Sequence, residues 1–113
     1  MADVMHAGHP NPLSLQRAAG MLKAAGDVER LRILALLLEG SMQVSEIAKQ
    51  TSAGLSTTSQ RLKLLRSEGL VVRSRRGREM HYSLADSHVR DLIANVIDHA
   101  DPTHLNTLNG EDS

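Results

Sequence analysis

Apolar residues recur at helical spacing in the first part of the chain. Within 13–25, one side of the predicted helix carries Leu15, Ala18, Ala19 and Leu22. The stretch 27–39 repeats the pattern over a broader apolar face, formed by Val28, Leu31, Ile33, Leu34, Leu37 and Leu38. Asp27 is placed to cap this second helix, and Gly40 is placed to end it. The pattern therefore predicts two consecutive amphipathic helices.

A short helix, a break and a longer helix come next. Val44, Ile47 and Ala48 give the short helix at 44–50 an inward side, and the residues at 51–54 interrupt it. The longer helix runs from Leu55 to a stop at Gly69. Its apolar stripe contains Leu55, Thr58, Leu62 and Leu65. Its opposite side is polar, with Ser56, Thr57, Gln60, Lys63 and Ser67, and with Arg61 on a flank. This order is typical of a helix-turn-helix.

Alternating residues after Gly69 predict a β-hairpin. Its two strands meet at the turn Arg75-Arg76-Gly77, which makes the tip basic. Asp86 then caps a last helix that extends to about Ala100, where the pair Asp101-Pro102 disfavours continuation. The predicted fold class is mainly α with a small β-hairpin, which is a winged helix-turn-helix whose hairpin is the wing.

Composition limits the size and the compartment. The 113 residues suit one small domain that would gain core by dimerising, and the single aromatic residue, Tyr82, leaves an aliphatic core. We expect a flexible arm at 1–12, one folded domain at 13–101 and a flexible tail at 102–113. The absence of cysteine excludes disulfides and thiolate metal sites. No apolar run suits a membrane span, and the first residues do not resemble a secretory signal, so the cytoplasm is the expected compartment.

Charge is distributed unevenly along the chain. The formal net charge is zero, yet the segment 61–79 contains seven basic and two acidic residues. Such a segment is either a solvated charged face or the electrostatic footprint of a nucleic-acid partner. The polar side of the longer helix can reach base edges in a major groove, and the hairpin arginines can reach phosphates or the minor groove. The predicted DNA-binding residues are Ser56, Thr57, Ser59, Gln60, Arg61, Lys63, Arg73, Arg75, Arg76 and Arg78.

Four segments together resemble the ArsR/SmtB family of bacterial winged-helix repressors. They are "DVERLRILALL", "VSEIAKQ", "TSQRLKLLRSEGLV" and "RRGREMHYSL", and with the last helix they cover roughly residues 13–100. The resemblance implies a homodimer joined by its first and last helices, operator DNA with an inverted repeat as partner, and repression that an inducer relieves. One departure is visible, because Ala53 and Gly54 stand where many members have a Leu-Ser pair. The choice between Ser56 and Thr57 as the DNA-contacting residue therefore stays open.

Three of the six histidines lie in or just after the last helix. His88 and His99 are eleven residues apart, so they face the same way but are separated by about 16 Å along the axis. Two antiparallel copies of the helix would bring His88 of one chain to His99 of the other. The family's last-helix metal site has the same spacing, and the resemblance implies Asp86, His88 and His99 as ligands. Its fourth position is Pro102 here, so Asp101 or His104 would take that place.

The identity of the inducer stays open at this point. A site of histidine and carboxylate suits tetrahedral Zn(II), whereas Ni(II) or Co(II) would need more ligands, which His6 and His9 could supply. The alternatives are a solvated helix edge, a site that has lost its fourth ligand, or a repressor of the same family that senses a non-metal ligand. We interpret His81 as structural. No nucleophile–base pair, phosphate-binding glycine loop or paired carboxylates indicate an enzyme, and the basic tip argues against a module for protein contacts only.

Overall fold

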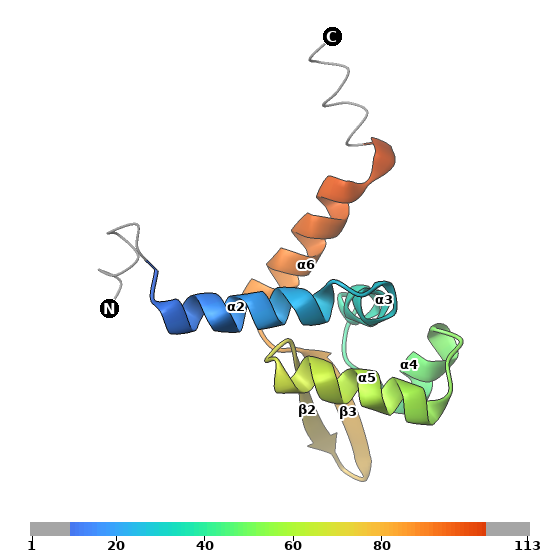
Figure 1. Ribbon diagram of the computed structural model, residues 1–113. Coiled ribbons are helices and arrows are strands. Elements are labelled where there is room, and N and C mark those ends of the chain that lie inside the picture. Colours follow the sequence, from blue (N-terminus) through green and yellow to red (C-terminus); the bar gives the residue numbers. More distant parts are fainter. Residues whose placement is uncertain (1–9, 104–113) are drawn as a thin grey trace.

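The structure is a computed structural model of the chain, and it describes residues 10–103 (Figure 1). Its elements in chain order are α2 (Pro12–Ala25), α3 (Val28–Leu37), β1 (Met42–Gln43), α4 (Val44–Gln50), α5 (Leu55–Ser67), β2 (Val71–Arg76), β3 (Glu79–Leu84) and α6 (Ser87–Ala100). The predicted order of helices and hairpin is confirmed. The fold class is confirmed as well, since the described chain is mainly helical with one small antiparallel sheet.

Side-chain caps explain where three helices begin. Asn11 Oδ1 accepts a hydrogen bond from the backbone N–H of Leu13 at 2.7 Å, at the start of α2. Asp27 Oδ2 accepts from the N–H of Arg30 at 3.0 Å, and Asp86 Oδ1 accepts from the N–H of Val89 at 3.0 Å. Asp27 and Asp86 are the caps predicted from the sequence. Each such cap contributes about 1 kcal/mol of stability.

The sheet has the strand order β1-β3-β2, with antiparallel neighbours. Its hairpin pairs run from Val71 opposite Leu84 to Arg76 opposite Glu79, and Gly77 closes the turn with φ +65°. Strand β1 was not predicted. It has only two residues, too few to show alternation, and it forms because Met42 pairs with Tyr82 of β3.

The core lies between α3, α5, α6 and one face of the sheet. Its fully buried large side chains include Ile33, Leu34, Leu37, Ile47, Leu62, Leu65, Leu70 and Ile93. Hydrogen bonds between elements add to this packing. The Arg90 guanidinium of α6 donates to the carbonyl oxygen of Leu38 at 2.6 Å, and Arg30 Nε donates to the carbonyl oxygen of Ala24 at 2.7 Å. These bonds fix α6 and α2 to the two ends of α3.

Four large apolar residues on the predicted apolar sides of the helices are exposed in the single chain. Leu15 and Leu22 of α2 are 54% and 57% exposed, Val28 is 70% exposed, and Leu55 is 57% exposed. Helical spacing predicts that residues share a side, but it does not say what covers that side. The buried residues of α2 are Ala24 and Ala25, next to α3, and its earlier turns extend away from the core (Figure 1).

The first and last described helices lie near the two ends of residues 10–103, and the predicted domain bounds at 13 and 101 stay a prediction. Helix α2 begins at Pro12 and α6 ends at Ala100. His6, His9 and His104 lie outside the described residues, as do most of the predicted arm and tail. Within residues 10–103, no helix is both long and apolar enough to cross a membrane.

Candidate DNA-binding surface and metal-binding residues

The polar side of α5 is presented to solvent. Thr58, Leu62 and Leu65 are buried on the opposite side of the helix and hold α5 against the core. At about 100° per residue, the predicted DNA-binding side chains that point away from the core within about 100° of one another are those of Ser56, Ser59, Gln60 and Lys63. Thr57 and Arg61 lie on the next flank, where Thr57 is exposed and Arg61 is half-buried. The predicted base-contacting set therefore divides into a central group and a flank.

The start of α5 is settled by the structure. The helix begins at Leu55, and Gly54 is its N-cap residue with φ −71° and ψ 160°. Both Ser56 and Thr57 fall in the first turn and both are exposed, so the helix start does not choose between them. No side chain among residues 10–103 caps this helix, in contrast to α2, α3 and α6. The N–H groups of its first turn are therefore available to an anionic partner such as a phosphate.

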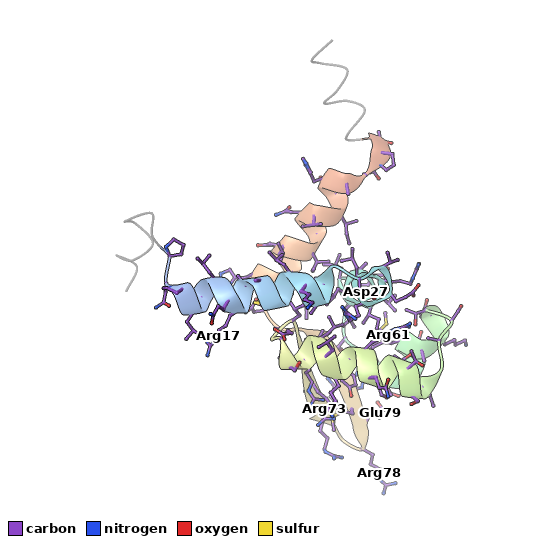
Figure 2. All side chains as sticks on the ribbon, viewed as in Figure 1. Arg17, Asp27, Arg61, Arg73, Arg78 and Glu79 are labelled. Carbon is purple, nitrogen blue, oxygen red and sulfur yellow. The ribbon has the colours of Figure 1, made fainter. Side chains whose placement is uncertain are left out.

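The wing, formed by β2 and β3, presents four arginines. Because side chains alternate along a strand, Arg73 and Arg75 share the sheet face of Tyr82 and Met80, and Arg76 points to the other face. Arg78 follows Gly77 at the tip, and Figure 2 shows it at the far end of the hairpin. All four arginines are exposed, and none forms an ion pair with a residue in the described region. Their charge is therefore available to phosphates.

His81 occupies the outer face of the sheet. It lies opposite Gln43 of β1 and Ser74 of β2, and its Nε2 is 3.2 Å from Glu79 Oε1. This contact joins two side chains of the same strand, β3.

The predicted metal ligands lie along the exposed side of α6. His88 and His99 are both exposed, and the helix between them is continuous, so the eleven-residue spacing of about 16 Å holds. One Asp86 oxygen caps α6, and Asp101 Oδ1 accepts from the N–H of Thr103 at 2.8 Å just after the helix. Within residues 10–103 of one chain, no three His, Cys, Asp or Glu side chains come close enough to hold a metal ion. A site using both histidines therefore requires two chains.

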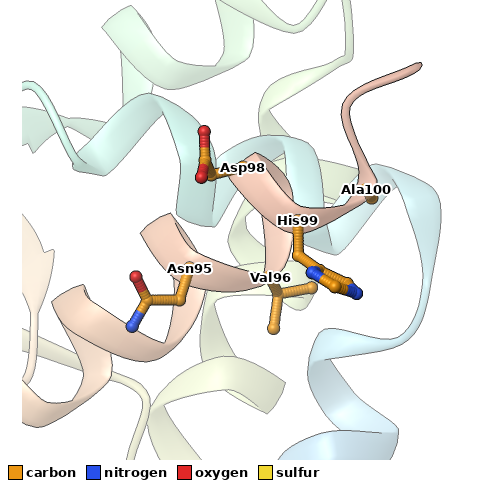
Figure 3. A pocket seen from close by; sticks show the side chains of 5 residues that line it. All are labelled: Asn95, Val96, Asp98, His99 and Ala100. Carbon is orange, nitrogen blue, oxygen red and sulfur yellow. The ribbon is translucent and has the colours of Figure 1, made fainter. Parts of the chain in front are cut away.

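A shallow depression flanks the last turns of α6 beside His99. Asn95, Val96, Asp98, His99 and Ala100 line it, and Figure 3 shows Asp98 pointing away from His99. Val96 and Ile97 are 46% and 36% exposed. On the first helix, Leu13, Leu15 and Leu22 are each more than half exposed. Apolar surface of this extent on two helices is typical of a protein–protein interface. The sequence signal for this surface was the helical spacing of apolar residues that the single chain leaves exposed.

A helix-turn-helix with an exposed polar second helix and a basic wing defines a class of protein, the winged helix-turn-helix regulators. A family profile described as "Bacterial regulatory protein, arsR family" matches residues 27–72. The transcriptional regulator NmtR of Mycobacterium tuberculosis is 39% identical over 97 residues, which is 83% of this chain and 81% of that protein. A SmtB homolog of Synechocystis, a transcriptional repressor, is 38% identical over 93 residues, or 80% and 70% of the two chains.

The solved structures agree with the sequence relatives. The homodimeric winged helix-turn-helix DNA-binding domain of Mb0332 from Mycobacterium bovis, a possible ArsR-family regulator, superposes with a TM-score of 0.74 at 36% identity. The match covers 81% of this chain and 88% of that one. The chain therefore belongs to the arsR family of bacterial regulatory proteins, and the resemblance stated from the sequence is confirmed.

Proposed function

We propose that the protein is a homodimeric transcriptional repressor that binds an inverted-repeat operator and is released from it by a divalent metal ion. Zn(II) is the metal we propose ahead of Ni(II) and Co(II). The observation that carries DNA binding is the exposed polar side of α5 beside four arginines without ion-pair partners in the described region. In this arrangement α5 enters the major groove with its first turn toward the base edges, and the wing follows the phosphates. The operator half-sites lie about one helical turn of DNA apart.

Self-association is supported by the uncovered apolar side chains of α2 and α6. A second copy that covers Leu15, Leu22, Val96 and Ile97 buries surface that one chain leaves in water. A symmetric pair uses the same patch twice, so each chain both offers and covers these residues. The similar M. bovis domain is described as homodimeric, which agrees with this arrangement.

The test of DNA binding uses the full chain and duplex DNA. Sedimentation first measures the oligomeric state at micromolar concentration, and fluorescence anisotropy then measures binding to fragments of the upstream region of its own gene. We expect a dimer that prefers one fragment over random duplex, with affinity that falls steeply as salt rises because counterions are released from phosphates. A monomer that binds no fragment in preference to random DNA contradicts the proposal.

The proposed metal site is shared between the subunits. Its ligands are Asp86 and His88 of one chain, His99 of the other, and Asp101 or His104 in the fourth position. Imidazole nitrogen and carboxylate oxygen fit Zn(II), and the capping bond of Asp86 occupies Oδ1 while Oδ2 remains able to ligate. Ni(II) or Co(II) would require additional donors, for which His6 and His9 are the candidates.

Release from DNA follows from linkage. Holding His88 of one chain against His99 of the other sets the crossing of the two α6 helices, and with it the separation of the two α5 helices. A metal that favours the arrangement unsuited to DNA shifts the equilibrium only by its differential affinity, typically about 1–3 kcal/mol. Metal and operator should therefore weaken each other's binding by the same factor.

A mixed dimer tests whether the site is intersubunit. We expect two Zn(II) per wild-type dimer by isothermal titration, and none for the His88→Ala or the His99→Ala homodimer. A dimer of one His88→Ala chain with one His99→Ala chain keeps one site, because both losses fall in the same pocket. If each chain binds its own metal, that mixed dimer binds none. Asp98→Asn is the matched control, since its side chain points away from His99 (Figure 3).

A second candidate is a repressor of the same family that responds to a non-metal ligand. The observation in its favour is Pro102, which occupies the expected fourth ligand position and cannot ligate through its side chain. Wild-type protein that binds its operator but takes up no Zn(II), Ni(II) or Co(II) would select this candidate.

A further inference from the structure

Neither the core packing of α5 nor the polar side of that helix explains why Leu55 is exposed. Its helical angle differs by only about 20° from that of Leu62 and about 60° from that of Thr58. Those two side chains are 1% and 0% exposed, whereas Leu55 is 57% exposed. The difference comes from its position, because Leu55 is the first residue of the helix. Helical side chains lean toward the N-terminus, so that of Leu55 extends beyond the packed part of α5.

The surroundings of Leu55 are small and open. Gly54 precedes it, and a Cβ added at Gly54 would meet no atom within 4 Å. Ser56 follows it, and Ser59 lies one turn further along; both are exposed. Leu55 is therefore the large apolar group at an otherwise small and polar helix end. The same end has no capping side chain within the described residues, and it adjoins the base-contacting side chains of the proposed DNA surface.

A second copy of the chain does not explain this exposure. The apolar side chains proposed for the dimer lie on α2 and α6, whereas the first turn of α5 adjoins α4. Figure 1 shows α6 rising from the opposite side of the molecule. The main contacts of α5 are with α2, α3, α4 and β2. Dimerisation through α2 and α6 therefore leaves Leu55 in water.

We infer that Leu55 reads a thymine in each operator half-site by apolar contact with the thymine C5-methyl group. The inference rests on the proposed DNA binding and specifies the base that one residue recognises. The N-terminal residues of a recognition helix contact base edges in the major groove. Among the four bases, thymine presents the methyl group there, and apolar side chains contact it. A leucine that is exposed at the start of α5 matches that group, whereas Ser56, Thr57 and Gln60 match donors and acceptors.

The test removes the methyl group and the side chain separately. An operator is first selected from a random duplex library with wild-type protein. Each thymine of both half-sites is then replaced in turn by deoxyuridine, which lacks only the methyl group, and Kd is measured by fluorescence anisotropy. We expect one thymine per half-site whose replacement weakens wild-type binding roughly fourfold, the effect of about one buried methyl group. The Leu55→Ala variant should bind the thymine operator more weakly than wild type, and its Kd should not change when that thymine is replaced by deoxyuridine. The Kd of the Leu55→Ile variant should still rise on the same replacement.

Leu64→Ala is the matched control, because Leu64 is an exposed leucine of the same helix at 38% but lies on another side. It should keep the wild-type response to deoxyuridine. The inference is overturned if deoxyuridine weakens the binding of wild type and of Leu55→Ala equally at every thymine. It is also overturned if Leu55→Ala loses the same affinity for the operator as for random duplex. Those results leave DNA binding itself standing. A library that yields no selected duplex instead removes the proposed function, and this inference with it.

Discussion

Thr58 provides a stability test that is independent of DNA and metal. It is the polar side chain buried in the core of the described chain, at 0% exposure, and its Oγ1 has no hydrogen-bond partner among residues 10–103. A buried hydroxyl without a partner destabilises the folded state by about 1–3 kcal/mol. Valine has nearly the same shape, with a methyl group in place of the hydroxyl. Thr58→Val should therefore raise the free energy of unfolding.

The expected gain is about 1–3 kcal/mol. The lost desolvation penalty contributes most of it, and the new buried methyl group adds roughly 0.8 kcal/mol at most. Helix propensity contributes little, because threonine and valine rank close together. For a domain of this size, each kcal/mol corresponds to a rise in Tm of roughly 4–8 °C. Self-association would make Tm depend on concentration, so both proteins are compared at one concentration.

Thermal and urea unfolding followed by far-ultraviolet circular dichroism measure this difference. Thr57→Val is the control, because it makes the same replacement one residue earlier in α5 on an exposed side chain. Its stability should change by no more than about 0.5 kcal/mol. If Thr58→Val is less stable than wild type while Thr57→Val is unchanged, the hydroxyl makes a favourable bond and the reasoning is refuted.

Further substitutions probe the DNA surface and the framework. Gln60→Ala should reduce the ratio of operator affinity to random-duplex affinity. Arg75→Ala should weaken binding to operator and random duplex alike, and should lower the slope of log K against log salt by about 1 in anisotropy titrations. If the two variants lose specificity equally, the roles assigned to Gln60 and Arg75 are wrong. Arg90→Ala removes the 2.6 Å bond to the carbonyl oxygen of Leu38 and should cost about 1 kcal/mol in urea unfolding, with an unchanged midpoint arguing that the bond is not formed in solution. Asp27→Ala removes the cap of α3 and should cost about 1 kcal/mol, which Asp27→Asn should largely restore.

Local chemistry determined the elements and their ends. Helical spacing, the carboxylates at Asp27 and Asp86 and the glycines at 40, 69 and 77 act over a few residues, so the helices and the hairpin could be predicted from the chain alone. The exposed polar side of α5 was also visible, because Thr58, Leu62 and Leu65 define its opposite side by spacing. The strand β1 was not visible, because two residues become a strand only when β3 lies beside them.

Tertiary structure decided which apolar residues are covered and which way each arginine points. Leu55 and Leu62 have nearly the same helical direction, yet one is exposed and the other buried, because burial depends on what packs against a position. Arg75 and Arg76 are adjacent in β2 and so lie on opposite faces, but only the register with β3 shows that Arg75 shares the face of Met80 and Tyr82. The spacing of His88 and His99 was readable from the chain, but about 16 Å of continuous helix separates them. Whether they meet is decided by the packing of two chains, because no conformation of one straight helix brings its two ends together.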